Sequence, residues 1–327
     1  MEKRSLGQDQ LTSSMQISSK RAHSQRVSKL RVSKKTRKRL IAYLLLSPLL
    51  ILLLMLLVGL LGGIVQSFGY IPEFGLHEFS LRHFLAVLSN ENLLASIGQS
   101  LYVAIVATIV ATILATALSY ALVITGHNRG AIFAIIKFPI FFPWMVTALL
   151  MIDLFSGGGL LANIFKALDF KAGMGFLNII LYSPTCLGII LAFVWAVTPF
   201  MAFFIVTIMA NITNTLSQAA LNLGASPRKS FFFVTLPLCF PAIKNVALIT
   251  LVSLFANYEI PLLLGMTTPR ALPVEIYAQL ETFPIARRPE LMALCLIMFA
   301  ASLLMVTLFY LVFQRKNINL KMPSKRI

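Results

Sequence analysis

Charged side chains are scarce in this sequence, and their scarcity excludes most classes of soluble protein. Asp, Glu, Lys and Arg make up 12% of the 327 residues, whereas about 25% is usual for soluble domains. Hydrophobic residues reach 58%, which is more than a water-soluble globule can bury. We therefore exclude a cytosolic enzyme, a disordered protein and a soluble DNA-binding domain. A polytopic membrane protein is the class that this composition fits.

Cysteine is also scarce, and motifs for catalysis or metal binding are missing. The three cysteines, Cys186, Cys239 and Cys295, lie in or beside apolar runs without a CxxC spacing, which is typical of small buried hydrophobes. The sequence contains no GxxxxGKS/T phosphate loop, no HExxH and no GxSxG, the patterns that mark common nucleotide, zinc and nucleophile sites. We expect no catalytic residue, no metal site and no cofactor in this chain.

Long apolar runs are what the sequence has in abundance. Six of them are long enough to cross a bilayer as a helix, which takes about 20 residues. They cover residues 40–66, 97–125, 131–155, 179–210, 243–266 and 291–313. The first run follows a basic segment, as a signal peptide would, but it exceeds the roughly 7–15 residues of a signal core. We predict an all-α fold with six transmembrane helices, the first of them uncleaved.

The basic residues indicate how these spans are oriented. Of the 28 Lys and Arg residues, 21 lie in the two tails and in the loops on the same side of the membrane, and six lie on the other side. Because cytoplasmic loops carry the excess of positive charge, both termini are expected in the cytoplasm. Residues 1–39 alone hold twelve of these charges. Their composition predicts a disordered tail that contacts anionic lipid rather than nucleic acid.

Small residues recur at every fourth position of the second run, where they share one helical face. They are Ala107, Ala111, Ala115 and Ser119. A neighbouring stripe consists of Thr108, Thr112 and Thr116. Small side chains let two membrane helices approach closely, so this face is interpreted as a packing surface, with a polar pathway lining as the alternative.

Two acidic residues fall at apparent membrane depth, where a carboxylate is expensive and usually faces a cavity or a partner. Asp153 stands near the end of the third run, as a solvated end residue would. Glu259 is deeper, between Asn257 and Pro261, and the proline can unwind the helix there. Glu259 and Asn257 are therefore candidates for the transport pathway, and a structural hydrogen-bonded role is the alternative.

A polar segment, residues 211–240, separates the fourth and fifth runs and looks too polar to continue the fourth helix. Thr215 and Gln218 have the spacing of a capping box that would start a short helix. Gly224 fits the left-handed position that ends such a helix. Ser226 can then cap a second helix.

This second helix has Pro227 at its first position and should end at Pro237, just before the fifth run. The segment is thus predicted to form two short helices joined by a tight turn. Such a helix–turn–helix, rigidly joined to the two neighbouring spans, can dock in a groove of a soluble partner and pass movement into the membrane. The alternative is an amphipathic loop that lies on the membrane surface.

The same segment resembles a known signature. The residues that carry the resemblance are Gln218, Ala219, Ala220, Gly224, Ala225, Ser226 and Pro227, followed by Phe231 and by residues 234–237. Their identity and spacing are similar to the EAA signature of permeases of binding-protein-dependent ABC importers. The likeness extends over residues 93–313, about two-thirds of the chain.

The resemblance implies a type I ABC importer permease of the bacterial inner membrane, with the substrate pathway in the membrane and no ATPase site of its own. It implies three kinds of partner: ATP-binding subunits that use ATP, a second permease of the same or a sister chain, and an external substrate-binding protein. In this family residues 211–240 would form the coupling segment. The nearest subgroup transports ferric iron, polyamines, thiamine or phosphonates. An ion-gradient-driven transporter or channel is the competing class.

The chain departs from the signature at two positions, where Gln218 and Asn222 replace acids that are usual in the family. Both replacements remove a negative charge and keep hydrogen-bonding capacity. We therefore expect the fold of the segment to survive and an ion pair to the ATPase subunit to be lost. The expected organisation is a basic tail (1–39), a first span (40–66), a permease core (93–313) and a C-terminal tail (314–327).

The topology can be tested by cysteine labelling in a chain that lacks its three native cysteines. A cysteine at Ser226 should react with a membrane-impermeant maleimide only after the cells are opened. A cysteine at Arg270, on the predicted outer side, should react in intact cells and serves as the control. Labelling of position 226 from outside would overturn both the orientation and the docking role of the polar segment.

Overall fold

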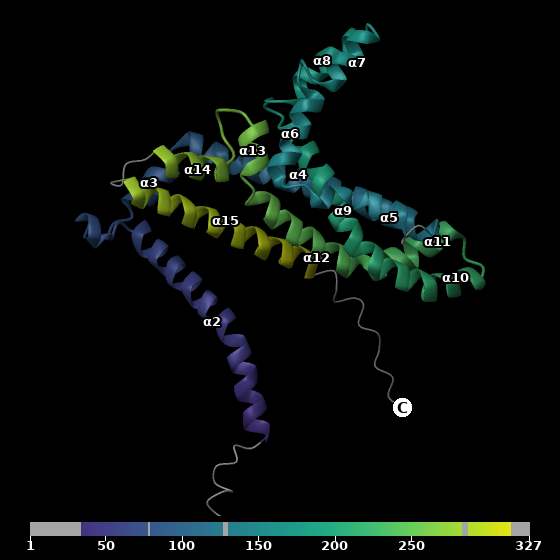
Figure 1. Ribbon diagram of the computed structural model, residues 1–327, viewed down its shortest axis with the longest axis horizontal. Helices are drawn as coiled ribbons and strands as arrows, with labels where there is room; N and C mark the ends of the chain where they lie inside the picture. The colour runs from purple at the N-terminus through teal and green to yellow at the C-terminus, as the bar shows by residue number, and fades with distance from the viewer. Residues whose placement is uncertain (1–33, 78, 127–129, 283–286, 315–327) are drawn as a thin grey trace, which may run out of the picture. The chain divides into compact units, whose positions relative to one another are not determined.

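The computed structural model describes residues 34–77, 79–126, 130–282 and 287–314 (Figure 1). Within these ranges the only strand-like feature is an isolated antiparallel bridge between Ile71 and Leu76. The α-helices are, in chain order, α2 (Lys34–Ser67), α3 (Arg82–Leu88), α4 (Glu91–Ile124), α5 (Ala131–Ile136), α6 (Trp144–Phe155), α7 (Leu160–Ala167), α8 (Lys171–Ile180), α9 (Leu187–Ile212), α10 (Gln218–Asn222), α11 (Pro227–Ser230), α12 (Leu236–Phe255), α13 (Glu259–Leu264), α14 (Leu272–Thr282) and α15 (Arg288–Gln314). The described residues also contain two short 3₁₀ helices, η1 (Pro72–Phe74) and η2 (Phe138–Phe141), and two π-helical turns, η3 (Thr213–Ser217) and η4 (Phe231–Thr235).

Six stretches are long and apolar enough to cross a membrane. They are Tyr43–Ser67, Glu91–Ile124, Trp144–Ala167, Leu187–Ile212, Pro227–Phe255 and Arg288–Phe313. The predicted number of spans and the all-α class are therefore confirmed. Several boundaries differ from those expected, and each difference has a local cause.

The chain divides into two units, the first of which ends at Gly62. It contains most of α2, which begins at Lys34, so residues 34–39 are helical instead of belonging to the expected disordered tail. The predicted tail over 1–33 and the C-terminal residues 315–327 lie outside the described residues.

The second unit is built around α4, α9 and α12, which pack on one another. The face predicted from the small residues of α4 is confirmed as a packing surface, because Ala107, Ala111, Ala115 and Ser119 are each 0% exposed. The Ser119 hydroxyl lies 2.6 Å from the carbonyl of Ala115 and 3.3 Å from that of Ala202 on α9. The absence of bulky side chains allows this close approach of α4 and α9.

Prolines break the third span, which was expected to run continuously over residues 131–155. Helix α5 gives way to η2 at Pro139, and α6 starts only after Pro143. Phe142 between them is extended, with ψ of 126°, because a proline disfavours the helical conformation of the residue before it. The membrane-crossing stretch therefore shifts to residues 144–167, and α6 and α7 share it.

The fifth span is broken as well, although its expected range of 243–266 was continuous. Helix α12 ends at Phe255, and the short helix α13 begins at Glu259. Pro261 lies in the first turn of α13, where its missing N–H costs no helical hydrogen bond. The predicted unwinding near the proline therefore occurs, one turn before it.

The tight contact of α4 with α9 should make the small residues of α4 sensitive to enlargement. Ala111→Leu should destabilise the purified chain in detergent by about 1–3 kcal/mol, because extra methylenes in a packed interface force side chains and backbone apart. Ala117, on the exposed side of the same helix, provides the matched control, and Ala117→Leu should be neutral. Equal thermal unfolding of the two variants would contradict this packing.

Candidate functional site

The polar segment is continuous with the helices on both sides of it. Helix α9 passes through η3 directly into α10, and α11 passes through η4 directly into α12. The two short helices are therefore not separate elements, and the expected rigid junction of the segment with the two neighbouring spans is confirmed. Polar side chains end the apolar run of residues, but they do not interrupt the backbone hydrogen bonds of the helix. Each membrane helix therefore continues beyond its apolar part.

The predicted capping box at Thr215 is wrong because of this continuity. The Thr215 hydroxyl donates to the carbonyl of Asn211 at 2.9 Å, within the continuous helix. A capping box serves the unpaired N–H groups at the start of a helix. Because α10 continues an existing helix, it has no such groups to cap.

Pro237 was expected to end the second helix, but α12 runs through it. The π-helical turn η4 ends at Thr235, just before the proline. Its wider i to i+5 bonding inserts an extra residue into the helix and so accommodates a residue that lacks an N–H and crowds the preceding turn. The helix therefore reaches from Pro227 to Phe255 without a break.

The turn between α10 and α11 has the predicted geometry. Gly224 has a φ of +86°, its N–H donates to Leu221 at 2.9 Å, and the N–H of Ala225 donates to Ala220 at 3.1 Å. This pair of bonds is the Schellman motif, which needs a left-handed residue. The Ser226 hydroxyl then accepts from the N–H of Lys229 at 3.4 Å and caps α11. The expected roles of Gly224 and Ser226 in the local structure are confirmed.

Together, α10 and α11 form a helical hairpin within residues 211–240. Two buried serines, which sequence reasoning missed, join its two sides. The hydroxyls of Ser217 and Ser230 lie 2.6 Å apart, and Ser230 also reaches the carbonyl of Ser217 at 3.2 Å. Both residues are buried. Phe231 anchors the hairpin to α4, since its ring centroid lies 3.8 Å from that of Tyr120. The only sequence signal was the near-symmetric placement of the two serines about Gly224.

The tip of the hairpin is apolar and basic. Leu223 is 89% exposed and Phe233 is 79% exposed, and Arg228 and Lys229 are also exposed. The polar segment carries no acidic residue, because Gln218 and Asn222 stand at the positions discussed above. Large apolar side chains that are exposed beside basic ones are typical of a surface for an interaction.

The two breaks in the membrane helices are joined to each other through Glu259. Its Oε2 accepts a hydrogen bond from the N–H of Met145 at 3.1 Å, in the first turn of α6. A carboxylate at this place satisfies a free N–H and complements the positive end of the helix dipole. Asn257 performs the same task locally, since its Oδ1 accepts from the N–H of Ile260 at 3.2 Å. Both candidate pathway residues therefore support helix ends.

Neighbouring residues hold the second break against α14. The rings of Tyr258 and Tyr277 stack with centroids 5.2 Å apart. The Tyr277 hydroxyl donates to Glu281 at 2.7 Å, and this hydrogen bond raises the pKa of the Tyr277 phenol above its ordinary value. Asp153, the other acid at apparent membrane depth, is exposed on α6.

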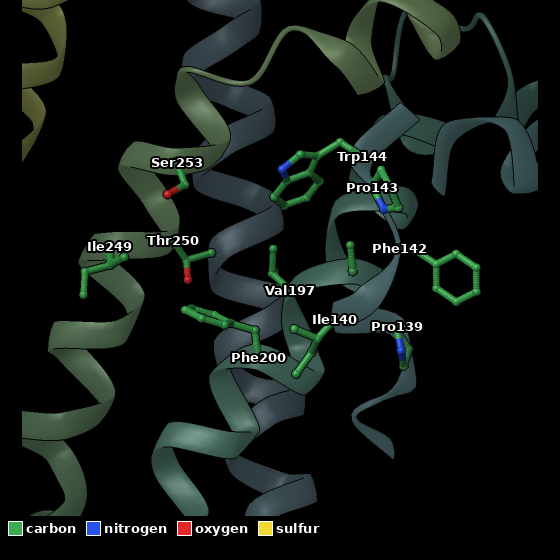
Figure 2. A pocket seen from close by; sticks show the side chains of 11 residues that line it. Pro139, Ile140, Phe142, Pro143, Trp144, Val197, Phe200, Ile249, Thr250 and Ser253 are labelled. Atoms are coloured by element: carbon green, nitrogen blue, oxygen red, sulfur yellow. The ribbon is translucent and has the colours of Figure 1, made fainter. Parts of the chain in front are cut away.

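A cavity of about 290 Å³ lies beside the break before α6 and is bordered by α9 and α12 (Figure 2). Trp144 at the start of α6 faces Thr250 and Ser253 of α12 across it, and Phe200 of α9 lies below them. The complete lining is Pro139, Ile140, Phe142, Pro143, Trp144, Ala196, Val197, Phe200, Ile249, Thr250 and Ser253. Glu259 and Asn257 do not line it. Asn257 lines a separate cavity of about 10 Å³, which is room for about one water molecule.

The profile of the family described as binding-protein-dependent transport system inner membrane component matches residues 126–319, more than half of the chain. The chain belongs to this family. As a multi-pass inner-membrane component, the family member uses its six apolar helices to cross the membrane. The resemblance inferred from the EAA-like residues is thereby confirmed.

Two relatives of the chain are permeases by description. The chain is 30% identical to the putrescine transport system permease protein PotI of Escherichia coli K12 over 167 residues, which cover 50% of this chain and 54% of PotI. It is 27% identical to the probable molybdenum ABC transporter permease protein of Haloferax volcanii over 206 residues, 61% of this chain and 71% of that protein. The chain therefore spans about half the length of the first of these relatives.

The fold has a close counterpart among solved structures. A chain of a bacterial ABC transporter involved in the import of the acidic polysaccharide alginate superposes with a TM-score of 0.68. The match covers 86% of this family member and 98% of the other chain, at 18% identity. The predicted type I ABC importer permease fold is confirmed by this likeness.

The role of Glu259 at the start of α6 leads to a stability prediction. Glu259→Leu removes the acceptor of the Met145 N–H and should destabilise the protein by about 1 kcal/mol. Glu259→Gln keeps an acceptor and loses only the charge–dipole contribution, about 0.3–1 kcal/mol. The exposed Asp153→Asn is the control. If Glu259→Leu unfolds at the same temperature as the wild type, the hydrogen bond does not stabilise the two breaks.

Proposed function

We propose that this family member is the membrane permease of an ABC importer, and that it couples to a separate ATP-binding subunit through the hairpin at residues 211–240. The observation that carries the proposal is the construction of this hairpin. It has a Schellman turn, a buried serine pair and an exposed apolar tip, and it lies at the ends of two uninterrupted helices (Figure 1).

Coupling requires an element that docks outside the membrane and transmits movement without bending. The residues proposed to dock are Gln218, Ala219, Ala220, Gly224, Ala225, Ser226 and Pro227. Because α10 continues α9 and α11 continues α12, a displacement of the tip acts on both membrane helices. Both helices also line the cavity of Figure 2, so the same displacement would act on its walls.

The remaining partners follow from the family. The permease would pair with a second permease of the same or a sister chain, with two ATP-binding subunits and with an external substrate-binding protein. ATP would be used by the partner, since this chain has no phosphate-loop motif. Both termini would lie in the cytoplasm, which places the hairpin on the side where ATP is available.

The substrate pathway is proposed to pass the two helix breaks that Glu259 and Asn257 support. Broken membrane helices line the substrate sites of many transporters, and the cavity of Figure 2 lies beside the break before α6. Within the proposed group of substrates, the likeness to a permease named for putrescine favours a polyamine over ferric iron, thiamine or a phosphonate.

Gly224 provides the decisive test of coupling. A side chain at this position meets no atom within 4 Å, so the cost of a substitution comes from the positive φ, about 1 kcal/mol for Ala and more for a β-branched residue. Gly224→Val should leave the spans inserted but uncouple ATP hydrolysis from transport, or release the ATP-binding subunit.

The measurement combines transport, ATPase stimulation by loaded binding protein and subunit co-purification in one reconstituted preparation. Gly157→Val is the matched control, because Gly157 also has open space around it and no positive φ. If Gly224→Val behaves as this control in all three assays, the hairpin is not the coupling element.

A further inference from the structure

A second apolar groove lies on the outside of the helical core, where α4, α12 and α15 meet. It encloses about 200 Å³ and is lined by Thr108, Ile109, Thr112, Ile113, Phe240, Ile243, Lys244, Ala247, Phe309 and Phe313. Three phenyl rings form one wall, since the Phe313 centroid lies 5.8 Å from that of Phe240 and 4.5 Å from that of Phe309. The groove opens outward, because Ile109 is 54% exposed and Ile113 is 63% exposed.

Lys244 is the one charged residue in this lining, and no acidic residue accompanies it there. It is half-buried. A cation among apolar side chains at membrane depth is costly unless it meets an anion or reaches the headgroup region. A lysine can do both by laying its methylene stem along the groove and extending its ammonium group towards water.

The depth of Lys244 suits a headgroup contact. Phe240 contacts Phe313, which lies at the end of α15 and is followed closely in the sequence by Arg315 and Lys316. Lys244 is one helical turn beyond Phe240, or about 6 Å at 1.5 Å per residue. Side chains lean towards the N-terminus of their helix, which for α12 is the cytoplasmic end in the proposed topology. The ammonium group can therefore reach the cytoplasmic headgroups.

We propose that this groove binds an anionic phospholipid of the cytoplasmic leaflet, with an acyl chain between the phenyl wall and α4 and its phosphate at Lys244. Basic pockets between membrane helices on this side suit anionic headgroups. An acyl chain is also the occupant that fits, because a helix is about 10–12 Å across with its side chains and cannot enter so small a groove. The proposal depends on the proposed topology but not on coupling or on the transported substrate.

The test is lipid retention by the full-length permease complex. The complex is reconstituted in phosphatidylcholine nanodiscs that contain a minor fraction of phosphatidylglycerol. Native mass spectrometry then measures the phosphatidylglycerol that remains bound after transfer to detergent. Lys244→Gln should lower retention about fivefold, the equivalent of the roughly 1 kcal/mol that a lysine contributes at an anionic membrane surface. Ala247→Phe, which fills the groove and keeps the lysine, should lower it at least as much.

Lys137→Gln is the control for the loss of a lysine elsewhere in the second unit. Lys137 lies outside the groove, with its Nζ 4.1 Å from the ring centroid of Phe133 and 4.3 Å from that of Phe203, and its replacement should leave retention unchanged. Thermal unfolding of each variant separates lipid loss from misfolding, and Ala247→Phe keeps the test decisive if Lys244→Gln does not fold.

Unchanged retention in both groove variants would overturn the proposal. A loss in Lys244→Gln alone would place the lipid outside the groove, and a loss in Ala247→Phe alone would remove the role of the charge. Photo-crosslinking from Ile113 to a protein subunit instead of to lipid would show that the groove is covered by a partner. An error in the topology would be detected independently by labelling at position 226.

Discussion

Every backbone N–H and C=O in a bilayer must find its partner within the protein, because lipid offers none. An unbroken helix satisfies this requirement alone, and a broken helix does not. At the break before α6, the carboxylate of Glu259 accepts the N–H of Met145. At the break before α13, the side chain of Asn257 accepts the N–H of Ile260. The two residues that the sequence nominates for transport are therefore also the ones that make the breaks tolerable.

The same requirement explains how prolines are handled in the second unit. Pro139 and Pro143 coincide with a true break, since the chain between them leaves the helical conformation. Pro237 does not break its helix, because the π-helical turn before it redistributes the hydrogen bonds. The outcome of each proline depends on what precedes it: the chain breaks beside the cavity, whereas it stays helical between the hairpin and α12.

The hairpin and the cavity are linked through shared helices. Helix α9 contributes Phe200 to the cavity and continues into α10, while α12 contributes Thr250 and begins at η4. Contacts between α4 and α9 are close because the facing side chains are small. In the coupling proposed above, a displacement of the hairpin would therefore also act on the walls of the cavity.

The sequence by itself determined the class of the protein, the six spans, the packing face of α4 and the turn at Gly224. These features depend on composition, on helical periodicity and on local backbone conformation, all of which act within a few residues. It predicted a rigid junction of the polar segment with the two spans, but not that α9 continues into α10 and α11 into α12 without a break. Hydropathy reports where a helix meets lipid and not where its hydrogen bonds end. Only the tertiary structure decided that Ser217 meets Ser230 and that Glu259 caps α6, because these pairs come from separate helices whose contact depends on how the whole core packs.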